Sequence, residues 1–140
     1  MQYTIRQAYP QDLETLDKIY TENMRGYVEL HYSWNPDLFK QNYASQNYQV
    51  IELDSQIIGF LKIMLSKANV YLGEIQITKK FQNLGIGTKI IKKIIKEAQL
   101  NRQRLWLRVI RGNPAEKLYR RLGFTTFASD STHIKLEIKE

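Results

Sequence analysis

One segment of the chain, residues 75–88, carries most of the information about its architecture: IQITKKFQNLGIGT. It opens with the alternating apolar residues typical of a strand, and it ends with two glycines that directly precede a helical pattern. Glycines at such a junction let the backbone turn so that several N–H groups converge, and the helix N-terminus adds roughly half a positive charge. The segment therefore favours an anion-binding loop between a strand and a helix.

Two well-known phosphate loops do not fit this segment. A P-loop requires Gly-Lys-Ser/Thr at its end, and no such triplet follows Gly85 or Gly87. The dinucleotide fingerprint requires a third glycine and a set of parallel strands, whereas residues 48–77 have the short spacing of an antiparallel meander. Two glycines before a helix can also serve close packing alone, so the segment by itself leaves both interpretations open.

The residues after this loop predict a helix and then another strand. From Gly87 to Leu100, isoleucines recur at helical spacing and oppose a face rich in lysine. Arg104–Ile110 is rich in β-branched and aromatic residues, which is typical of a strand. Strand, loop, helix and strand together predict a β-α-β crossover between two parallel strands.

The remaining segments add strands and helices on both sides of this crossover. Pro10 is expected to open a helix, and further short helices are expected at Pro36–Tyr43 and from Pro114 onward. The other expected strands are residues 3–7, 48–53, 57–65, 70–77, 124–128 and 132–138. These patterns predict a single α+β domain over residues 1–140, with a mixed, mainly antiparallel sheet of six to seven strands and about four helices.

Composition excludes several classes of protein. The 140-residue chain has no cysteine, which rules out disulfides, thiolate nucleophiles and iron–sulfur clusters. Its two histidines, His31 and His133, lie far apart in the sequence, so we expect no metal site. Its apolar runs are too short to cross a membrane, and residues 1–10 lack the pattern of a signal peptide. We therefore expect a cytoplasmic protein with no membrane partner.

The positive charge is concentrated in one part of the chain. Residues 79–121 contain 13 Lys and Arg against two acidic residues, whereas the whole chain has a formal charge of +7. Such a segment suits a polyanion, whether a nucleic acid, a membrane surface or a phosphorylated small molecule. The alternative is a set of solvated helix faces, and charge alone does not decide between them.

A second motif, N-x-A-x-x-x-Y-x-x-x-G-F, spans residues 113–124. Together with Q-x-x-G-x-G at residues 82–87, and in this order, it resembles the GNAT superfamily of acetyl-CoA-dependent N-acetyltransferases. The resemblance covers residues 75–124 and implies a GNAT-like fold, in which the strand ending at Ile77 splays from the strand at Leu105–Ile110. Acetyl-CoA, the acetyl donor, would bind in the resulting cleft, which also gives the basic segment a specific anionic partner.

The resemblance implies two groups of residues that bind acetyl-CoA. The strand before the loop would offer main-chain hydrogen bonds, and the loop would wrap the pyrophosphate with backbone N–H groups. The second motif would contribute from the other side of the cleft. The cofactor-binding residues implied are Ile75, Gln76, Ile77, Thr78, Gln82, Asn83, Leu84, Gly85, Ile86, Gly87, Thr88, Lys89, Asn113, Ala115, Lys117 and Tyr119.

Tyr119 is the candidate catalytic acid. Attack of an amine on a thioester produces a thiolate leaving group, which benefits from a proton donor, and a phenol can supply that proton. The resemblance implies this role for Tyr119. The alternative interpretation is a helix tyrosine that packs beside Ala115 and Leu122.

Glu74 is the candidate catalytic base, because the amine must lose a proton before it attacks. It is the only carboxylate between Asp54 and Glu97, and it stands in an otherwise apolar strand beside the expected cleft. Tyr71 is the second candidate. Glu74 could equally be a strand residue that faces solvent.

The acceptor is expected to contact aromatic residues and a basic residue. Aromatic rings suit a cationic or amphipathic amine, although they could equally form the core beneath two short helices. Arg108 stands where some members of the family carry an acidic or histidine side chain, which suggests that an anionic group of the substrate is held there. The candidate substrate-binding residues are Tyr27, His31, Trp34, Tyr71 and Arg108.

These observations lead to one hypothesis and one rival. The hypothesis is direct transfer of an acetyl group from acetyl-CoA to a primary amine of a small molecule, peptide or protein, without a covalent enzyme intermediate, since no cysteine is available. The rival is a non-catalytic module that senses acetyl-CoA or binds nucleic acid through residues 79–121. Nucleic acid is the less favoured partner, and a homodimer is left open.

Overall fold

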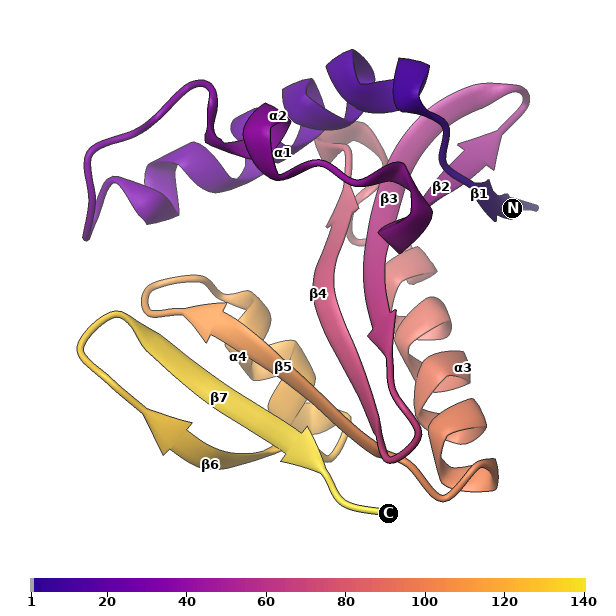
Figure 1. Cartoon of the computed structure of the whole chain (residues 1–140), viewed down its shortest axis with the longest axis vertical. Coiled ribbons are helices and arrows are strands. Elements are labelled where there is room, and N and C mark those ends of the chain that lie inside the picture. Colours follow the sequence, from indigo (N-terminus) through magenta and orange to yellow (C-terminus); the bar gives the residue numbers. More distant parts are fainter. Residues whose placement is uncertain (1) are drawn as a thin grey trace.

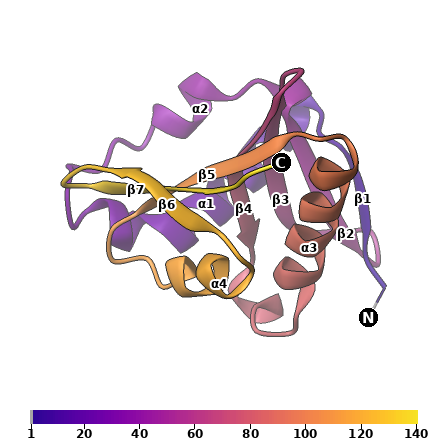
Figure 2. The same cartoon turned by 90° about the horizontal axis from the view of Figure 1, so that it is seen from below.

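The computed structural model describes residues 2–140, which form a seven-stranded sheet with helices on both faces (Figures 1 and 2). The strand order is β1-β2-β3-β4-β5-β7-β6, and every pair of neighbours is antiparallel except β4 and β5. The strands are β1 (Thr4–Gln7), β2 (Tyr48–Leu53), β3 (Gln56–Leu65), β4 (Asn69–Ile77), β5 (Arg104–Ile110), β6 (Thr125–Ser129) and β7 (His133–Ile138). The helices are α1 (Leu13–Val28), α2 (Leu38–Asn42), α3 (Ile86–Leu100) and α4 (Ala115–Arg121).

The helices cover opposite faces of the sheet (Figure 2). On one face, the isoleucine stripe of α3, including Ile90 and Ile94, packs with buried strand residues such as Leu107, and α4 lies beside it. On the other face, α1 and α2 bury a second cluster in which Leu16 packs with Phe60. Each such fully buried side chain contributes roughly 1.5–3 kcal/mol to stability, so the apolar periodicity of α3 accounts for its docking.

This architecture confirms the predicted α+β fold and its β4-α3-β5 crossover. Two predicted helix starts were wrong by a few residues. Pro10 opens a single 3-10 turn, and the α-helix begins at Leu13; the second helix begins at Leu38 rather than at Pro36. At the first of these sites the Asp12 carboxylate accepts a hydrogen bond from the Tyr9 N–H (2.7 Å), which closes a tight turn before the α-helix begins.

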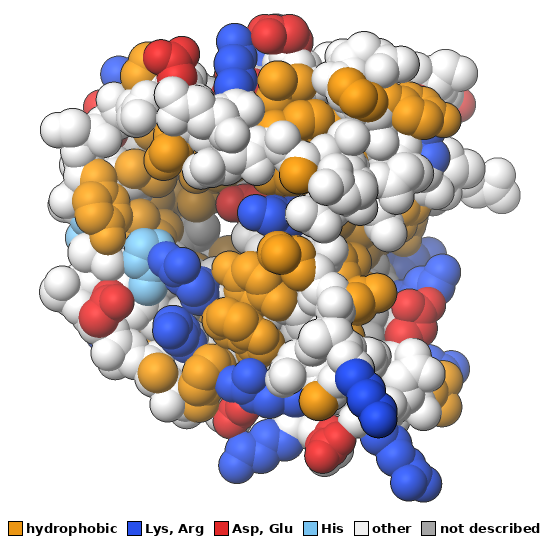
Figure 3. Space-filling model, viewed as in Figure 1, with side chains coloured by type: hydrophobic (Ala, Val, Ile, Leu, Met, Phe, Trp, Pro, Cys, Tyr) orange, Lys and Arg blue, Asp and Glu red, His pale blue; other side chains and the backbone are white. Residues whose placement is uncertain are grey.

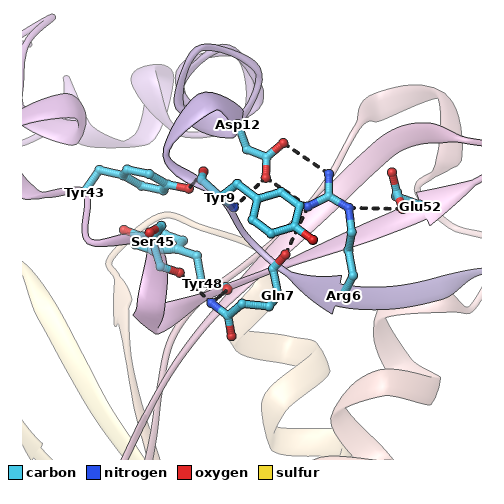
Figure 4. Close-up of polar contacts among 8 residues, drawn as sticks. All are labelled: Arg6, Gln7, Tyr9, Asp12, Tyr43, Ser45, Tyr48 and Glu52. Carbon is cyan, nitrogen blue, oxygen red and sulfur yellow. Dashed lines mark hydrogen bonds and ion pairs between the residues drawn. The ribbon is translucent and has the colours of Figure 1, made fainter.

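A polar cluster fixes the start of α1 to the edge of the sheet (Figure 4). The Arg6 guanidinium on β1 donates two hydrogen bonds to Asp12, at 2.9 and 3.1 Å, and also pairs with Glu52 on β2. The Arg6 side chain and the Tyr9 amide donate hydrogen bonds to the Asp12 carboxylate, and together they hold the pKa of Asp12 below its ordinary value, although partial burial opposes them. The cluster therefore positions α1 across the face of β3 and β4.

Strands β4 and β5 run side by side at one end and separate toward the other (Figure 1). Their pairing extends only from Asn69↔Arg104 to Leu72↔Leu107, although both strands continue beyond it. At the same place the pairing of β3 with β4 shifts register, because Lys62 pairs with Glu74 and Ile63 with Leu72, which leaves Gly73 unpaired. Such a bulge bends its strand and re-aims the residues that follow, so Gly73 lies at the point where β4 departs from β5.

Candidate functional site

A cavity of about 810 Å³ lies where β4 and β5 separate, and its walls come from α1, β4, β5, the loop before α3, and α4. Figure 3 shows the same face of the molecule hollowed near its middle, with acidic and basic side chains at the edge of the hollow. Because the two strands no longer pair there, the β5-facing edge of β4 from Gly73 to Ile77 has no strand partner. The cavity is therefore bordered by main chain that has no strand partner as well as by side chains.

The loop before α3 forms one end of the cavity. Gly85 has φ 87° and Asn83 has φ 62°, so two residues adopt the left-handed conformation that turns the chain into the helix. Within residues 2–140, the N–H groups of residues 83–88 have no hydrogen-bond acceptor, and apart from the adjacent residues and the helix's own backbone no atom lies within 4 Å of the position that a Cβ on Gly85 or Gly87 would take. Free N–H groups at the start of a 15-residue helix, with open space before them, have the geometry that suits an anion.

Side chains around the end of β4 are held by hydrogen bonds to the same carbonyl. The Asn23 amide on α1 and the Gln82 amide each donate to the Ile77 carbonyl oxygen at 2.8 Å. Asn23 also donates to the Gln76 side chain at 3.1 Å. These bonds fix α1, the end of β4 and the loop in one arrangement.

Glu74 faces the cavity from β4, opposite Lys62 of β3. The Gln76 amide donates a hydrogen bond to the Glu74 carboxylate (2.9 Å). Burial raises the pKa of Glu74 to about 7, and the Gln76 bond and the Lys62 charge only partly oppose this effect. A carboxylate with a pKa near neutrality is suited to accept and release a proton at physiological pH.

Tyr119 faces the cavity from α4 and makes an edge-to-face contact with Phe124, with ring centroids 5.8 Å apart. In the described part of the chain its hydroxyl has no hydrogen-bond partner, so it is free to donate into the cavity. Burial, and secondarily the negative charge of Glu74, raise the pKa of Tyr119 above its ordinary value. The phenol therefore keeps its proton, and it is a weaker acid than an exposed tyrosine.

The far end of the cavity is aromatic and basic. Tyr71 stacks on Trp106 with ring centroids 4.2 Å apart, and both Tyr71 and Tyr27 line the cavity. Arg108 lines it from β5, two residues beyond Trp106 on the same face of the strand. Burial raises the pKa of Tyr71, whereas the Arg108 charge acts in the opposite direction. This end can accommodate a polar ligand between an aromatic wall and a guanidinium.

The structure brings most of the predicted site residues to this one cavity. Both catalytic candidates line it, and so do the candidate cofactor residues Ile75, Gln76, Ile77, Gln82, Asn83, Gly85, Ile86, Gly87, Thr88, Asn113, Ala115 and Lys117. Three other candidates of that group, Thr78, Leu84 and Lys89, do not line it.

Two of the candidate acceptor residues also lie outside the cavity lining. The His31 ring nitrogen Nε2 is 2.9 Å from the Arg111 carbonyl oxygen, so it ties the segment after α1 to the end of β5. Trp34 stacks with Tyr20 at 6.0 Å and lies beneath the Arg25 guanidinium. Their contacts are with neighbouring protein groups.

Several lining residues are not among the candidates named from the sequence, and they include Tyr20, Asn23, Lys62 and His133. Lys62 stands in an otherwise apolar strand, and that isolated charge is the signal that could have identified it. Asn23 lies more than 50 positions from its partner Gln76, so no local pattern indicates it.

The described residues contain neither a membrane-spanning helix nor a cluster of metal-ligating side chains. No helix in residues 2–140 is both long and apolar enough to cross a membrane. No group of three or more potential metal-ligating side chains comes together in this part of the chain.

Comparison with known proteins identifies the family to which the chain belongs. The sequence model of the Acetyltransferase (GNAT) domain matches residues 44–126, which is more than half of the chain and includes β4, the loop, α3, β5 and α4. No curated protein matches the sequence significantly.

Solved structures share the fold at low sequence identity. PaiA N-acetyltransferase of Thermoplasma acidophilum, solved with coenzyme A, superposes with a TM-score of 0.80 over 100% of both chains, at 19% identity. The ribosomal-protein-S18-alanine N-acetyltransferase of Escherichia coli has a TM-score of 0.74 at 19% identity, covering 99% of this chain and 94% of that one. N-acetylglutamate synthase of Neisseria gonorrhoeae, solved with coenzyme A and N-acetyl-glutamate, has a TM-score of 0.69 at 17% identity, covering 99% of this chain and 35% of that one.

Proposed function

This chain belongs to the GNAT acetyltransferase family, and we propose from this premise that it transfers an acetyl group from acetyl-CoA to a primary amine by direct attack in a ternary complex. The acceptor is an amine of a small molecule, peptide or protein. The observation that carries the proposal is the cavity between β4 and β5, because Glu74, Tyr119 and the free N–H groups before α3 all border it.

The residues of the cavity fit acetyl-CoA. The free N–H groups of residues 83–88 suit a pyrophosphate, and Lys79 and Lys117 line the cavity on that side, where they can neutralise phosphate charge. Apart from the Ile77 carbonyl, which accepts from Asn23 and Gln82, the edge of β4 from Gly73 to Ile77 offers main-chain groups to an extended amide-containing arm, as an added strand would use them. Two of the structural neighbours, PaiA and the N-acetylglutamate synthase, were solved with coenzyme A, which supports this assignment.

Glu74 serves as the base for the acceptor amine. Acetyl-CoA supplies an activated thioester, and the amine must be unprotonated to attack it. A carboxylate with a pKa of about 7 is ionised in a large fraction of molecules at neutral pH and can take the proton directly or through one water molecule. The amine nitrogen then forms the new amide bond while the carbon–sulfur bond breaks.

Tyr119 serves as the acid for the departing sulfur, and its proton affinity is linked to that of Glu74. The negative charge of Glu74 contributes to the raised pKa of Tyr119. Once Glu74 has taken the proton from the amine it is neutral, so this contribution disappears and Tyr119 becomes a stronger acid. The proton transfer that activates the amine therefore also makes Tyr119 a better proton donor to the thiolate.

Binding and turnover test this proposal together. Acetyl-CoA should raise the melting temperature at concentrations above its dissociation constant, and a panel of primary amines should release CoA thiol in its presence. ATP serves as a polyanion control, because binding through charge alone would be equal for the two ligands and would disappear with added salt. Equal stabilisation by ATP, or acetyl-CoA binding without thiol release for any amine, would contradict the proposal.

A further inference from the structure

Arg108 lines the far end of the cavity, and its guanidinium has no hydrogen-bond or ion-pair partner in the described part of the chain. The sheet carries three arginines, and two of them are neutralised: Arg6 pairs with Asp12 and Glu52, and Arg104 pairs with Glu137 at 2.6 Å. Arg108 lies on the same face of β5 as Arg104 and is exposed, and its side chain makes no ion pair or hydrogen bond with any residue from 2 to 140. Its five donors are therefore available to a ligand.

The neighbours of Arg108 on β7 do not balance this positive charge. Its direct partner across the antiparallel pair is Lys135, which adds to it. The next pair on the same face joins Ile110 to His133, and burial and the Arg108 charge lower the pKa of His133, so this ring supplies no counter-charge. Like charges directly opposite in a sheet destabilise it, so the Arg108–Lys135 pair is a local conflict of the kind found at functional sites. On β4, the nearest carboxylate is Glu74, which already has Lys62 opposite to it.

The cavity thus has two poles on its acceptor side. One pole is Glu74 on β4, which suits the amine, and the other is Arg108 on β5, beyond the last residue pair that joins these two strands. A ligand that spans the gap between the separated strands meets both. A simple alkylamine would pair with Glu74 and leave Arg108 without a counter-charge.

We infer that the acceptor is an amine that also carries an oxyanion group, a carboxylate or a phosphate, and that Arg108 binds this group while Glu74 receives the amine. The inference rests on the proposed acetyl transfer and names its acceptor class. A guanidinium presents a planar fork that matches either oxyanion, and Lys135 on the facing strand adds to the attraction.

Matched pairs of acceptors test the inference. β-Alanine and its amide, phosphoethanolamine and ethanolamine, and a short peptide with an N-terminal Asp and its Asn counterpart each differ by one negative charge. Thiol release should show a kcat/KM at least roughly 10-fold higher for the anionic member of at least one pair. The pair that responds distinguishes a free carboxylate, a phosphate and a peptide carboxylate.

Variants of Arg108 then assign the preference to this side chain. Arg108→Gln should raise KM for the preferred anionic acceptor roughly 10- to 100-fold with little change in kcat, so that the preference over the neutral member of the pair is lost. Arg108→Lys should restore part of the preference. Arg102→Gln, which removes an exposed arginine after α3, is the matched control and should behave like the parent.

The outcomes separate this inference from the proposed function. Equal turnover of both members of every pair, or an Arg108→Gln variant that keeps the preference, would overturn the inference and leave acetyl transfer standing. Binding of acetyl-CoA without turnover of any amine would overturn both. Circular dichroism of each variant should match that of the parent, because the substitutions are at exposed positions.

Discussion

Replacing Glu74 by Gln should make the protein more stable at neutral pH and leave its stability almost unchanged in acid. The folded state holds the Glu74 proton up to a pKa of about 7, whereas the unfolded state releases it near the ordinary 4.5. Between these two values the folded state binds more protons than the unfolded state, so the free energy of unfolding falls as pH rises. At 1.36 kcal/mol for each pH unit, the full difference is about 3 kcal/mol.

Glutamine removes this pH-dependent loss because it has nearly the same shape as glutamate and stays neutral. Its side-chain oxygen can still accept the hydrogen bond from Gln76, which is 2.9 Å long in the parent. Glu74→Gln should therefore match the parent at pH 4.5 and exceed it by about 3 kcal/mol at pH 8.

Urea unfolding followed by the fluorescence of Trp34 and Trp106 measures this difference across the pH range. Glu97→Gln serves as the control, because it removes a carboxylate from an exposed position on α3. If the free energy of unfolding depended on pH in the same way for the parent and for Glu74→Gln, the reasoning would be refuted. Glu74 would then ionise as easily in the folded protein as in the unfolded one. The same raised pKa predicts that kcat/KM rises with pH through about 7 and that this limb is lost in Glu74→Gln.

Three further substitutions test other parts of the account. Tyr119→Phe should lower kcat roughly 10²- to 10⁴-fold with little change in acetyl-CoA affinity, and steady-state thiol release at full parent turnover would show that the tyrosine is structural. Gly87→Glu should abolish the thermal shift by acetyl-CoA without loss of stability, because its Cβ enters open space and a carboxylate suits a helix N-terminus, whereas Gly87→Ala should keep the shift. Asp12→Asn should cost roughly 1–3 kcal/mol at pH 7. Since the pKa of Asp12 is lowered, the parent loses this stabilisation as pH falls through the folded pKa, so urea curves of the two proteins should converge in strong acid.

The fold could be predicted from sequence because its signals are local. The isoleucine period of α3, the glycines at 85 and 87, and the short strands before them each depend on neighbouring residues only. The helix starts were less accurate near Pro10, where the Asp12 carboxylate turns back toward Arg6 and Tyr9. That arrangement depends on the contact of Arg6 on β1 with Asp12 directly before α1, and the spacing of apolar residues does not indicate such a contact.

The site was predictable where its residues follow one another along β4, the loop and α4. It was not predictable where strand register decides which side chains meet. The bulge at Gly73 places Glu74 opposite Lys62, and only the pairing of β3 with β4 reveals this. Likewise, the conflict between Arg108 and Lys135 depends on the pairing of β5 with β7. Trp34 is a similar case, since composition alone does not separate an aromatic residue that packs on Tyr20 from one that lines a cavity.

The central claim is that the cavity between β4 and β5 joins an acetyl donor directly to an amine, and transfer of a deuterated acetyl group tests it most directly. The protein is mixed with acetyl-CoA labelled in the acetyl group and with the preferred amine, and mass spectrometry follows the label while a thiol reagent follows free CoA. The account predicts that the label appears on the amine nitrogen in an amount equal to the CoA released, and that none remains on the protein. Label on the protein, or CoA release without a labelled amide, would contradict it.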